Sequence, residues 1–97
     1  MRIDRKLEGS KLTIALAGKL NTITAPQLDA ELAELNGITE LVLDFAELEQ
    51  ISSAGLRVLL SAQCTMDEQG KMLVTHVNEV VHEVFVLTGF INFLTIE

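Results

Sequence analysis

A strand, a helix and a second strand follow one another in the middle of the chain, and this succession constrains the fold most. The segment ELVLDF (40–45) carries three consecutive apolar residues, which is typical of a strand covered on both faces, as in parallel sheets. After a loop, AELEQI (46–51), we predict a helix over residues 53–69 that stops at Gly70. KMLVT (71–75) is the next apolar strand. Two strands joined by a helix over about 35 residues form a right-handed βαβ unit.

The segment before this unit predicts two strands and a helix. RIDRKL (2–7) is a strand candidate with few apolar residues. KLTIALA (11–17) alternates apolar and other residues, which is the period of a half-buried strand, and the glycine after it is expected to end the strand. Thr24 and Gln27 match a capping box. The leucines that follow at i, i+4 and i+7 predict a helix that ends near Asn36-Gly37.

The segment VNEVVHEVFVL (77–87) combines valine, which favours strands, with helical spacing of its apolar residues. Because pattern usually overrides propensity, we predict a helix, closed by Gly89. FLTI (93–96) predicts a last short strand. Together these elements indicate an α/β fold in which residues 1–97 form one domain, a mixed β-sheet of about five strands with helices packed mainly on one face.

Composition narrows the class of protein. A chain of 97 residues with 48% hydrophobic content can bury one core, and its single cysteine cannot form an internal disulfide, which favours a reducing, cytoplasmic location. Seven basic against fourteen acidic residues give a net charge of −7, which disfavours nucleic-acid binding. No apolar run reaches the roughly 18–20 residues that span a bilayer, and no signal peptide opens the chain. The acidity fits either a basic partner or a soluble surface.

Two adjacent hydroxyls, Ser52 and Ser53, stand where the central helix is expected to begin. A serine there commonly caps the helix, because its oxygen accepts a hydrogen bond from an otherwise unpaired amide. The same position suits a phosphate, since a helix N-terminus offers free N–H groups and a partial positive charge. Arg57 follows Ser53 by one helical turn and could pair with a phosphate, with acidic residues of the preceding loop, or with solvent. A plain cap, a modification site or both therefore remain open.

The central helix is rich in apolar residues for a helix that lies on one face of a sheet. One set is expected to fill the core, namely Leu56, Leu59, Leu60 and Cys64. A second set points elsewhere, namely Val58, Ala62 and Met66. Either neighbouring helices cover the second set, or it belongs to a protein-binding face whose edge carries the serines.

Motifs of catalysis are missing from the chain, which contains no GxSxG elbow, no phosphate-binding glycine loop and no HExxH. His76 and His82 are distant from the serines in sequence and are expected to face solvent, whereas a nucleophilic serine needs a base within hydrogen-bonding reach. Cys64 is expected to be a small buried apolar group. We therefore expect no enzyme, with no catalytic residues, no metal site and no cofactor.

Three segments stand out besides the order of the elements: GKLNTITAPQL, ELVLDFAELEQISSAGLRVLL and HEVFVLTGFINFLTI. They resemble STAS domains, in particular stand-alone bacterial anti-sigma factor antagonists, over the whole chain. The resemblance implies partner switching, in which the unphosphorylated antagonist binds an anti-sigma factor, often a serine kinase of the histidine-kinase-like ATPase fold. The kinase phosphorylates a serine at the start of the helix and the complex separates. A PP2C-type phosphatase resets the switch.

Matching the family motif D-S-[ST]-G-L to this chain implies that Ser53 is the phosphorylated residue, with Ser52 as second choice. Ser52 stands at the position of the aspartate and Ala54 at that of the second hydroxyl, while the last two positions of the motif agree. Asn21 stands where family members often carry an acidic residue. With fewer negative charges nearby, phosphorylation would change the surface more strongly.

The resemblance implies a contact surface that runs over the early loop, the loop before the central helix and the exposed flank of that helix. Its partner-binding residues would be Asn21, Thr22, Thr24, Glu49, Ser52, Ser53, Gly55, Leu56, Arg57, Val58 and Met66. An alternative is a STAS accessory subunit of a membrane transport assembly, which would dock permanently through the same surface without phosphorylation. A small-ligand sensor would need a sizeable apolar pocket, to which nothing in the sequence points. Neither nucleic acid nor direct membrane insertion is expected.

Overall fold

Four strands form one mixed sheet in the order β1-β2-β3-β4 in the computed structural model, which describes residues 1–97. Strand β1 (Arg2–Glu8) pairs antiparallel with β2 (Lys11–Leu20). Strand β3 (Glu40–Ile51) lies parallel to β2 on one side and to β4 (Lys71–Thr75) on the other. The parallel pairing of β3 with β4 confirms the strand–helix–strand unit predicted for the middle of the chain.

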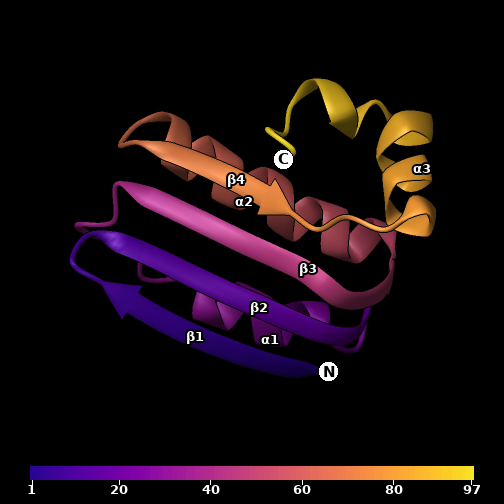
Figure 1. The fold of residues 1–97 in the computed structure, drawn as a ribbon, viewed down its shortest axis with the longest axis horizontal. Helices are drawn as coiled ribbons and strands as arrows, with labels where there is room; N and C mark the ends of the chain where they lie inside the picture. The colour runs from indigo at the N-terminus through magenta and orange to yellow at the C-terminus, as the bar shows by residue number, and fades with distance from the viewer.

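The helices gather on one side and at one end of the sheet. Figure 1 shows α1 (Ala25–Glu31) and α2 (Ser53–Asp67) behind the sheet. Helix α3 (Glu79–Thr88) lies at the end where β3 leads into α2, and the 3₁₀ turn η1 (Phe90–Asn92) follows it. This arrangement confirms the predicted α/β class, a mixed sheet with helices mainly on one face.

The core lies between the sheet and the helices. Along β2 and the first half of β3, buried side chains alternate with half-buried ones, as expected for strands with one covered face. The buried set on these two strands is Leu12, Ile14, Leu16, Leu41, Leu43 and Phe45, and it belongs to one cluster with the apolar residues of the helices. The uncovered face carries small or β-branched residues such as Thr13, Ala15 and Val42, which are half-buried.

Strand β3 continues through residues 46–51, so the loop predicted there is wrong. The cause is a change of period: buried residues are two apart up to Phe45 and then three apart, at Leu48 and Ile51. The pairing register with β2 shifts twice in this stretch, and β3 contains one extra residue at each shift. Such β-bulges bend a strand and break its alternation, which hides the strand from a test of period two. Strand β2 likewise passes through Gly18, which was expected to end it, and continues to Leu20.

Helix α1 is shorter than predicted, because it ends at Glu31 instead of near Asn36-Gly37. Leu32 and Leu35 are buried all the same, in the irregular segment after the helix. The side chain of Gln69, just past α2, donates hydrogen bonds to the carbonyls of Leu35 (2.5 Å) and Ile38 (2.7 Å). The segment after α1 is thus held by a side chain of another element, which gives these carbonyls hydrogen-bond partners.

The C-terminal helix is confirmed, with Asn78 as its cap and Gly89, in the left-handed conformation, at its end. The predicted last strand is reduced to one parallel bridge between Val74 and Ile96. Two hydrogen bonds hold it, from the amide of Val74 to the carbonyl of Thr95 and from the amide of Glu97 to the carbonyl of Val74, both 2.9 Å. The chain therefore has four strands and a bridge where about five strands were expected.

Candidate functional site

Helix α2 begins directly at the end of β3, at the edge of the sheet where β2 also ends. Ser52 lies in the N-cap position with extended backbone (φ −105°, ψ 177°). Its amide donates to the carbonyl of Leu20 at 2.9 Å, and its carbonyl accepts from the amide of Leu56 at 3.0 Å. Backbone bonds on both sides therefore fix the start of the helix relative to β2.

The two serines differ in accessibility. Ser53, the first residue of α2, is exposed. The hydroxyl oxygen of Ser52 is buried and has no hydrogen-bond partner, and it does not accept a bond from the first turn of the helix. The side-chain cap that was one of the open interpretations is therefore not formed. A hydroxyl available to another protein is found only at Ser53 of the pair.

Gly55 and Leu56 are buried, so they position the site rather than line its surface. A Cβ atom on Gly55 would lie 2.7 Å from Cγ of Leu20 and 2.9 Å from Cγ1 of Ile51. Glycine at this position lets the first turn of α2 approach the ends of β2 and β3 closely. Because Gly55 and Leu56 are buried, they would support a contact surface from beneath and offer it little area of their own.

The early loop is held in shape by the side chains of Asn21 and Thr24. Oδ1 of Asn21 accepts hydrogen bonds from the amides of Ile23 (3.0 Å) and Thr24 (3.1 Å). Oγ1 of Thr24 accepts from the amide of Asn21 (2.8 Å) and donates to the carbonyl of Lys19 (2.6 Å). The predicted capping box of Thr24 and Gln27 is wrong, because Thr24 does not cap α1 and its hydroxyl is engaged in this loop.

The same loop presents two exposed residues beside α2. Thr22 is exposed, as expected for a contact residue. Ile23 is 81% exposed, the largest value among the big apolar side chains of the protein. Sequence reasoning placed residues 21–24 on the contact surface but did not single out Ile23, because one apolar residue in a loop carries no periodic signal. Its exposure marks the loop as a place where another protein could bury apolar surface.

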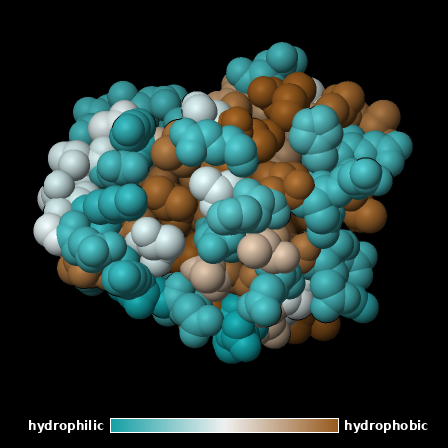
Figure 2. Space-filling view, in the orientation of Figure 1, coloured by the Kyte–Doolittle hydropathy of each residue, from teal (hydrophilic) through white to brown (hydrophobic).

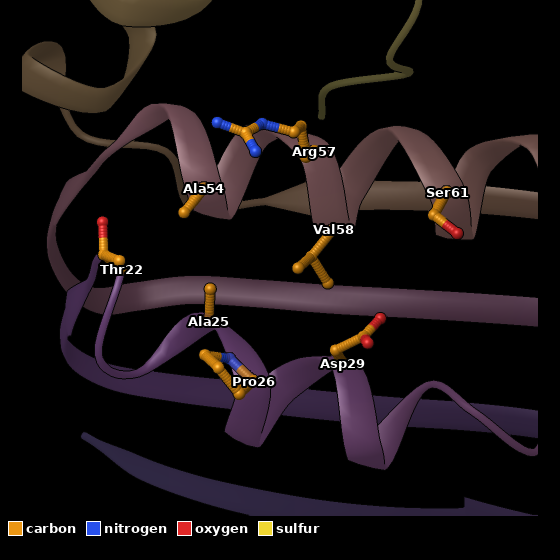
Figure 3. Close-up of a pocket in the computed structure, with 8 residues that line it drawn as sticks. All are labelled: Thr22, Ala25, Pro26, Asp29, Ala54, Arg57, Val58 and Ser61. Atoms are coloured by element: carbon orange, nitrogen blue, oxygen red, sulfur yellow. The ribbon is translucent and has the colours of Figure 1, made fainter.

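A groove of about 320 Å³ runs between α1 and α2 (Figure 3). Its lining residues are Thr22, Ala25, Pro26, Asp29, Ala54, Arg57, Val58 and Ser61. The side chain of Val58 projects between the two helices, and the carboxylate of Asp29 points toward α2. Of the predicted contact residues, the groove brings together Thr22, Arg57 and Val58.

Small side chains make up much of this groove, and of those on α2 sequence reasoning singled out Val58 but neither Ala54 nor Ser61. Ala54, Val58 and Ser61 follow at i, i+4 and i+7 on α2, which puts them on one stripe facing α1. This spacing was the signal that could have found them.

The residues of α2 that are buried are only in part the ones predicted from the sequence. Met66 is fully buried, and Ala62 and Val58 are only 3% and 9% exposed. Leu60 is 38% exposed and Cys64 is exposed, although both were expected to fill the core. Helix α1 packs against α2 and covers the flank that was thought to be free. Met66 therefore does not lie on an exposed flank, and Val58 reaches the surface only through the groove.

Arg57 is exposed and has no carboxylate partner among the ion pairs of the structure. Its guanidinium extends toward the N-terminal end of α2 (Figure 3). Glu47, one of the alternatives for pairing, binds Arg2 at 2.7 Å instead. Glu49 is exposed near the end of β3 and outside the groove. The first turn of α2 contains no acidic residue.

The histidines lie on other parts of the surface. His76 is exposed after β4, with its ring Nδ1 3.0 Å from Oδ1 of Asp44, and His82 is exposed on α3. The protein contains no group of three or more His, Cys, Asp or Glu side chains placed to hold a metal ion. None of its helices combines the length and the apolar character needed to cross a membrane.

The fold and the site define a small α/β domain with a helix N-terminus and an adjacent groove at its surface. The family model described as "Mlab, STAS domain" matches residues 3–95. The chain is 41% identical to the anti-sigma factor antagonist BtrV of Bordetella bronchiseptica over 90 residues, which cover 90% of this chain and 77% of BtrV. The chain thus belongs to the STAS domain family.

Solved structures agree with this assignment at the level of the fold. An anti-sigma factor antagonist of Thermotoga maritima superposes with a TM-score of 0.88 at 19% identity, over 97% of this chain and 84% of that protein. The phosphorylated form of the Bacillus cell fate determinant SpoIIAA gives a TM-score of 0.77 at 16% identity, over 99% of this chain and 91% of SpoIIAA.

Proposed function

We propose that this protein is an anti-sigma factor antagonist, a regulatory binding protein that is released from its anti-sigma factor when Ser53 is phosphorylated. The contact surface consists of Thr22, Ile23, the groove between α1 and α2, and the first turn of α2. The relationship to BtrV, an anti-sigma factor antagonist, supports the activity. The accessible hydroxyl of Ser53 supports the switch.

The observation that carries the switch is the contrast between the two serines. A kinase must align the attacking hydroxyl with the γ-phosphate of ATP, so the oxygen has to be reachable. Ser53 is exposed at the tip of α2, whereas the oxygen of Ser52 is buried. Phosphorylation of Ser52 would require the start of the helix to open, which makes Ser53 the better acceptor.

The unmodified site has room for the charge of a phosphate. Phosphorylation adds about −1.5 to −2 charges at neutral pH. The N-terminus of α2 carries partial positive charge, and neither an acidic residue nor a side-chain cap in its first turn opposes a phosphate. Arg57, unpaired and directed toward this end of the helix, can approach a phosphate on Ser53. The fold should therefore survive the modification.

The partner would not tolerate the same charge. Its contact surface lies against Ile23, Val58 and Ala54, which are apolar. Burying a dianion there costs several kcal/mol unless the partner pairs it. A cost of about 3 kcal/mol weakens binding roughly a hundredfold. Release thus follows from electrostatics alone and needs no rearrangement of the domain.

The resemblance to the stand-alone antagonists supports a partner that is also the kinase. That partner is an anti-sigma factor with the histidine-kinase-like ATPase fold, and a PP2C-type phosphatase restores the unmodified protein. The antagonist itself supplies no catalytic group and works in the cytoplasm, where sigma factors act.

Intact-protein mass after incubation with ATP and a lysate of the source organism tests the proposal. We expect one added phosphate on the wild type and on the matched control Ser52→Ala, and none on Ser53→Ala. A phosphate that persists on Ser53→Ala would move the site, in the first place to Ser52. If no variant is modified while the lysate phosphorylates another substrate, the surface serves permanent docking, as in the accessory subunit of a membrane transport assembly.

A further inference from the structure

Exposed apolar side chains are concentrated at the C-terminal end of the protein, away from the groove. Seven large hydrophobic residues are exposed in the whole chain, and four of them lie within residues 80–93. These four are Val80 (59%), Val86 (50%), Leu87 (77%) and Phe93 (63%). Figure 2 shows apolar side chains gathered over α3 and the segment after it, at the upper right. Such clustering is more than the scattered exposure common on protein surfaces.

Helix α3 carries two apolar stripes, and the fold uses only one. Val81 and Phe85 are fully buried and face the core. Val80, Val84 and Leu87 follow at i, i+4 and i+7, so they form a second stripe beside the first. Val84 is half-buried and the other two are exposed. Val84 also packs against the core cluster, so the part of the second stripe without a partner in the domain is Val80 and Leu87.

The formal charges on α3 and on the segment that follows it have one sign. No lysine or arginine follows Lys71 in the sequence, while three glutamates do. Two of them, Glu79 and Glu83, are exposed on α3 and stand one turn apart. We call the exposed stripe together with Phe93 and these two glutamates the α3 surface. It is apolar in its middle and acidic at its rim.

We propose that the α3 surface is a second docking site, which takes an amphipathic helix of another protein with an apolar face bordered by lysine and arginine. Opposite charges at the rim favour that partner over others. A second copy of this chain, docked through the same surface, would offer these glutamates no lysine or arginine from its own α3 surface. An anionic membrane would repel these glutamates.

This site is separate from the proposed switch. Figure 2 views the molecule from the side of the sheet opposite α1 and α2, and the apolar side chains over α3 are open on that side. The groove lies between α1 and α2. The α3 surface therefore contributes no residue to the groove, although α3 and Ser53 lie at the same end of the sheet, and the inference goes beyond the proposed function.

Titration of the ¹⁵N-labelled protein with a synthetic helical peptide, leucines on one face and lysines on the other, tests the inference. We expect amide shifts centred on residues 79–93. The double variant Val80→Ser/Leu87→Ser should weaken binding about tenfold, as expected for the loss of two apolar contacts. Leu7→Ser removes another exposed leucine, on β1 (55%), and should leave binding unchanged. Glu79→Gln/Glu83→Gln should weaken binding severalfold and reduce its dependence on salt.

Three results would overturn the inference. One is a set of shifts centred on other acidic parts of the surface, such as β1. Another is undiminished binding by Val80→Ser/Leu87→Ser, with its fold verified by circular dichroism. The third is equal binding of a matched peptide with glutamate in place of lysine. Sedimentation of the protein alone is the companion measurement, and a dimer that Leu87→Ser abolishes would assign the surface to a second copy instead.

Discussion

Ser52 and Ser53 are neighbours in sequence with opposite roles. The extended backbone of Ser52 belongs to the end of the strand, and its hydroxyl is enclosed without a hydrogen bond. Ser53 takes the first helical position and is exposed. The backbone changes from extended at Ser52 to helical at Ser53. The side chain of Ser52 therefore points into the protein, whereas that of Ser53 points into solvent. The choice of acceptor in the proposed switch rests on this difference.

Removing the hydroxyl of Ser52 should therefore cost little. Serine to alanine at an N-cap usually destabilises a protein by about 0.5–2 kcal/mol, but here no cap bond is lost. We expect Ser52→Ala to leave the free energy of unfolding unchanged or to raise it, as measured by urea denaturation. The matched control is Asn78→Ala, since Oδ1 of Asn78 accepts from the amide of Val81 at 2.8 Å. It should show the full loss, and a similar loss for Ser52→Ala would contradict the buried, unpaired hydroxyl.

The close contacts around Gly55 leave no room for a larger residue at this position. Alanine there would push a methyl group into Leu20 and Ile51, at 2.7 and 2.9 Å. Overpacking of this kind costs about 1–3 kcal/mol, which exceeds the gain of up to about 1 kcal/mol in helix propensity. We predict that Gly55→Ala lowers the free energy of unfolding. Ser61→Ala, at an exposed position of the same helix, should not, and a stabilised Gly55→Ala would argue against the close approach of α2.

At the scale of elements, α2 decides the geometry of the site because it is covered twice. The sheet covers one side and α1 covers a flank, so Ala62 and Met66 are buried as well as Leu59. What remains at the surface is the N-terminal turn, the groove and an outer face with Leu60 and Cys64. The contact surface is therefore smaller than the sequence suggested, and it lies toward the N-terminus of the helix.

Truncation of two apolar residues of α2 distinguishes the observed buried face of this helix from the one predicted from the sequence. Met66 is fully buried, so Met66→Ala should cost about 2–5 kcal/mol of unfolding free energy. Leu60 is 38% exposed, so Leu60→Ala should cost less than about half of that. Chemical denaturation of both variants gives the comparison. A larger loss of unfolding free energy for Leu60→Ala than for Met66→Ala would support the sequence prediction, in which Leu60 fills the core and Met66 is exposed.

Much of the fold could be predicted from the sequence where local pattern and tertiary role coincide. Strand β4 and helix α3 show this, since the short apolar run of β4 and the 3.6-residue period of α3 match what the core requires. The second half of β3 could not be predicted, because its bulges arise from pairing with β2 and destroy the period. The sequence likewise could not decide whether the second apolar flank of α2 is covered, because this depends on where α1 packs. For the site, the motif indicated Ser53, but the exposure of Ile23 needed the three-dimensional arrangement.

At the scale of the whole molecule, the proposed switch requires only that the domain hold a negative charge on Ser53 in a fixed place. Backbone hydrogen bonds tie Ser52 to β2, and side-chain bonds of Asn21 and Thr24 fix the neighbouring loop. Nothing in this arrangement needs to move for a phosphate on Ser53 to be accommodated. Modification should therefore change what the protein binds without changing its fold.

A negative charge on Ser53 tests this rigidity. Ser53→Asp places a carboxylate at the N-terminus of α2, where the helix dipole favours it by about 0.3–1 kcal/mol at low salt. We predict a small rise in unfolding free energy that disappears at high salt, measured by urea denaturation. Ser61→Asp, in the middle of the helix, is the matched control and should show no rise. An unfolded Ser53→Asp would mean that the site cannot hold a phosphate.

The affinity of the anti-sigma factor for the unmodified and the Ser53-phosphorylated protein, measured by calorimetry, tests the central claim most directly. We predict that phosphorylation weakens binding about a hundredfold, that Ser53→Ala binds like the unmodified protein, and that Ser53→Asp binds poorly while remaining folded. Equal affinities for the two forms, or a folded Ser53→Ala that fails to bind, would contradict a switch at Ser53.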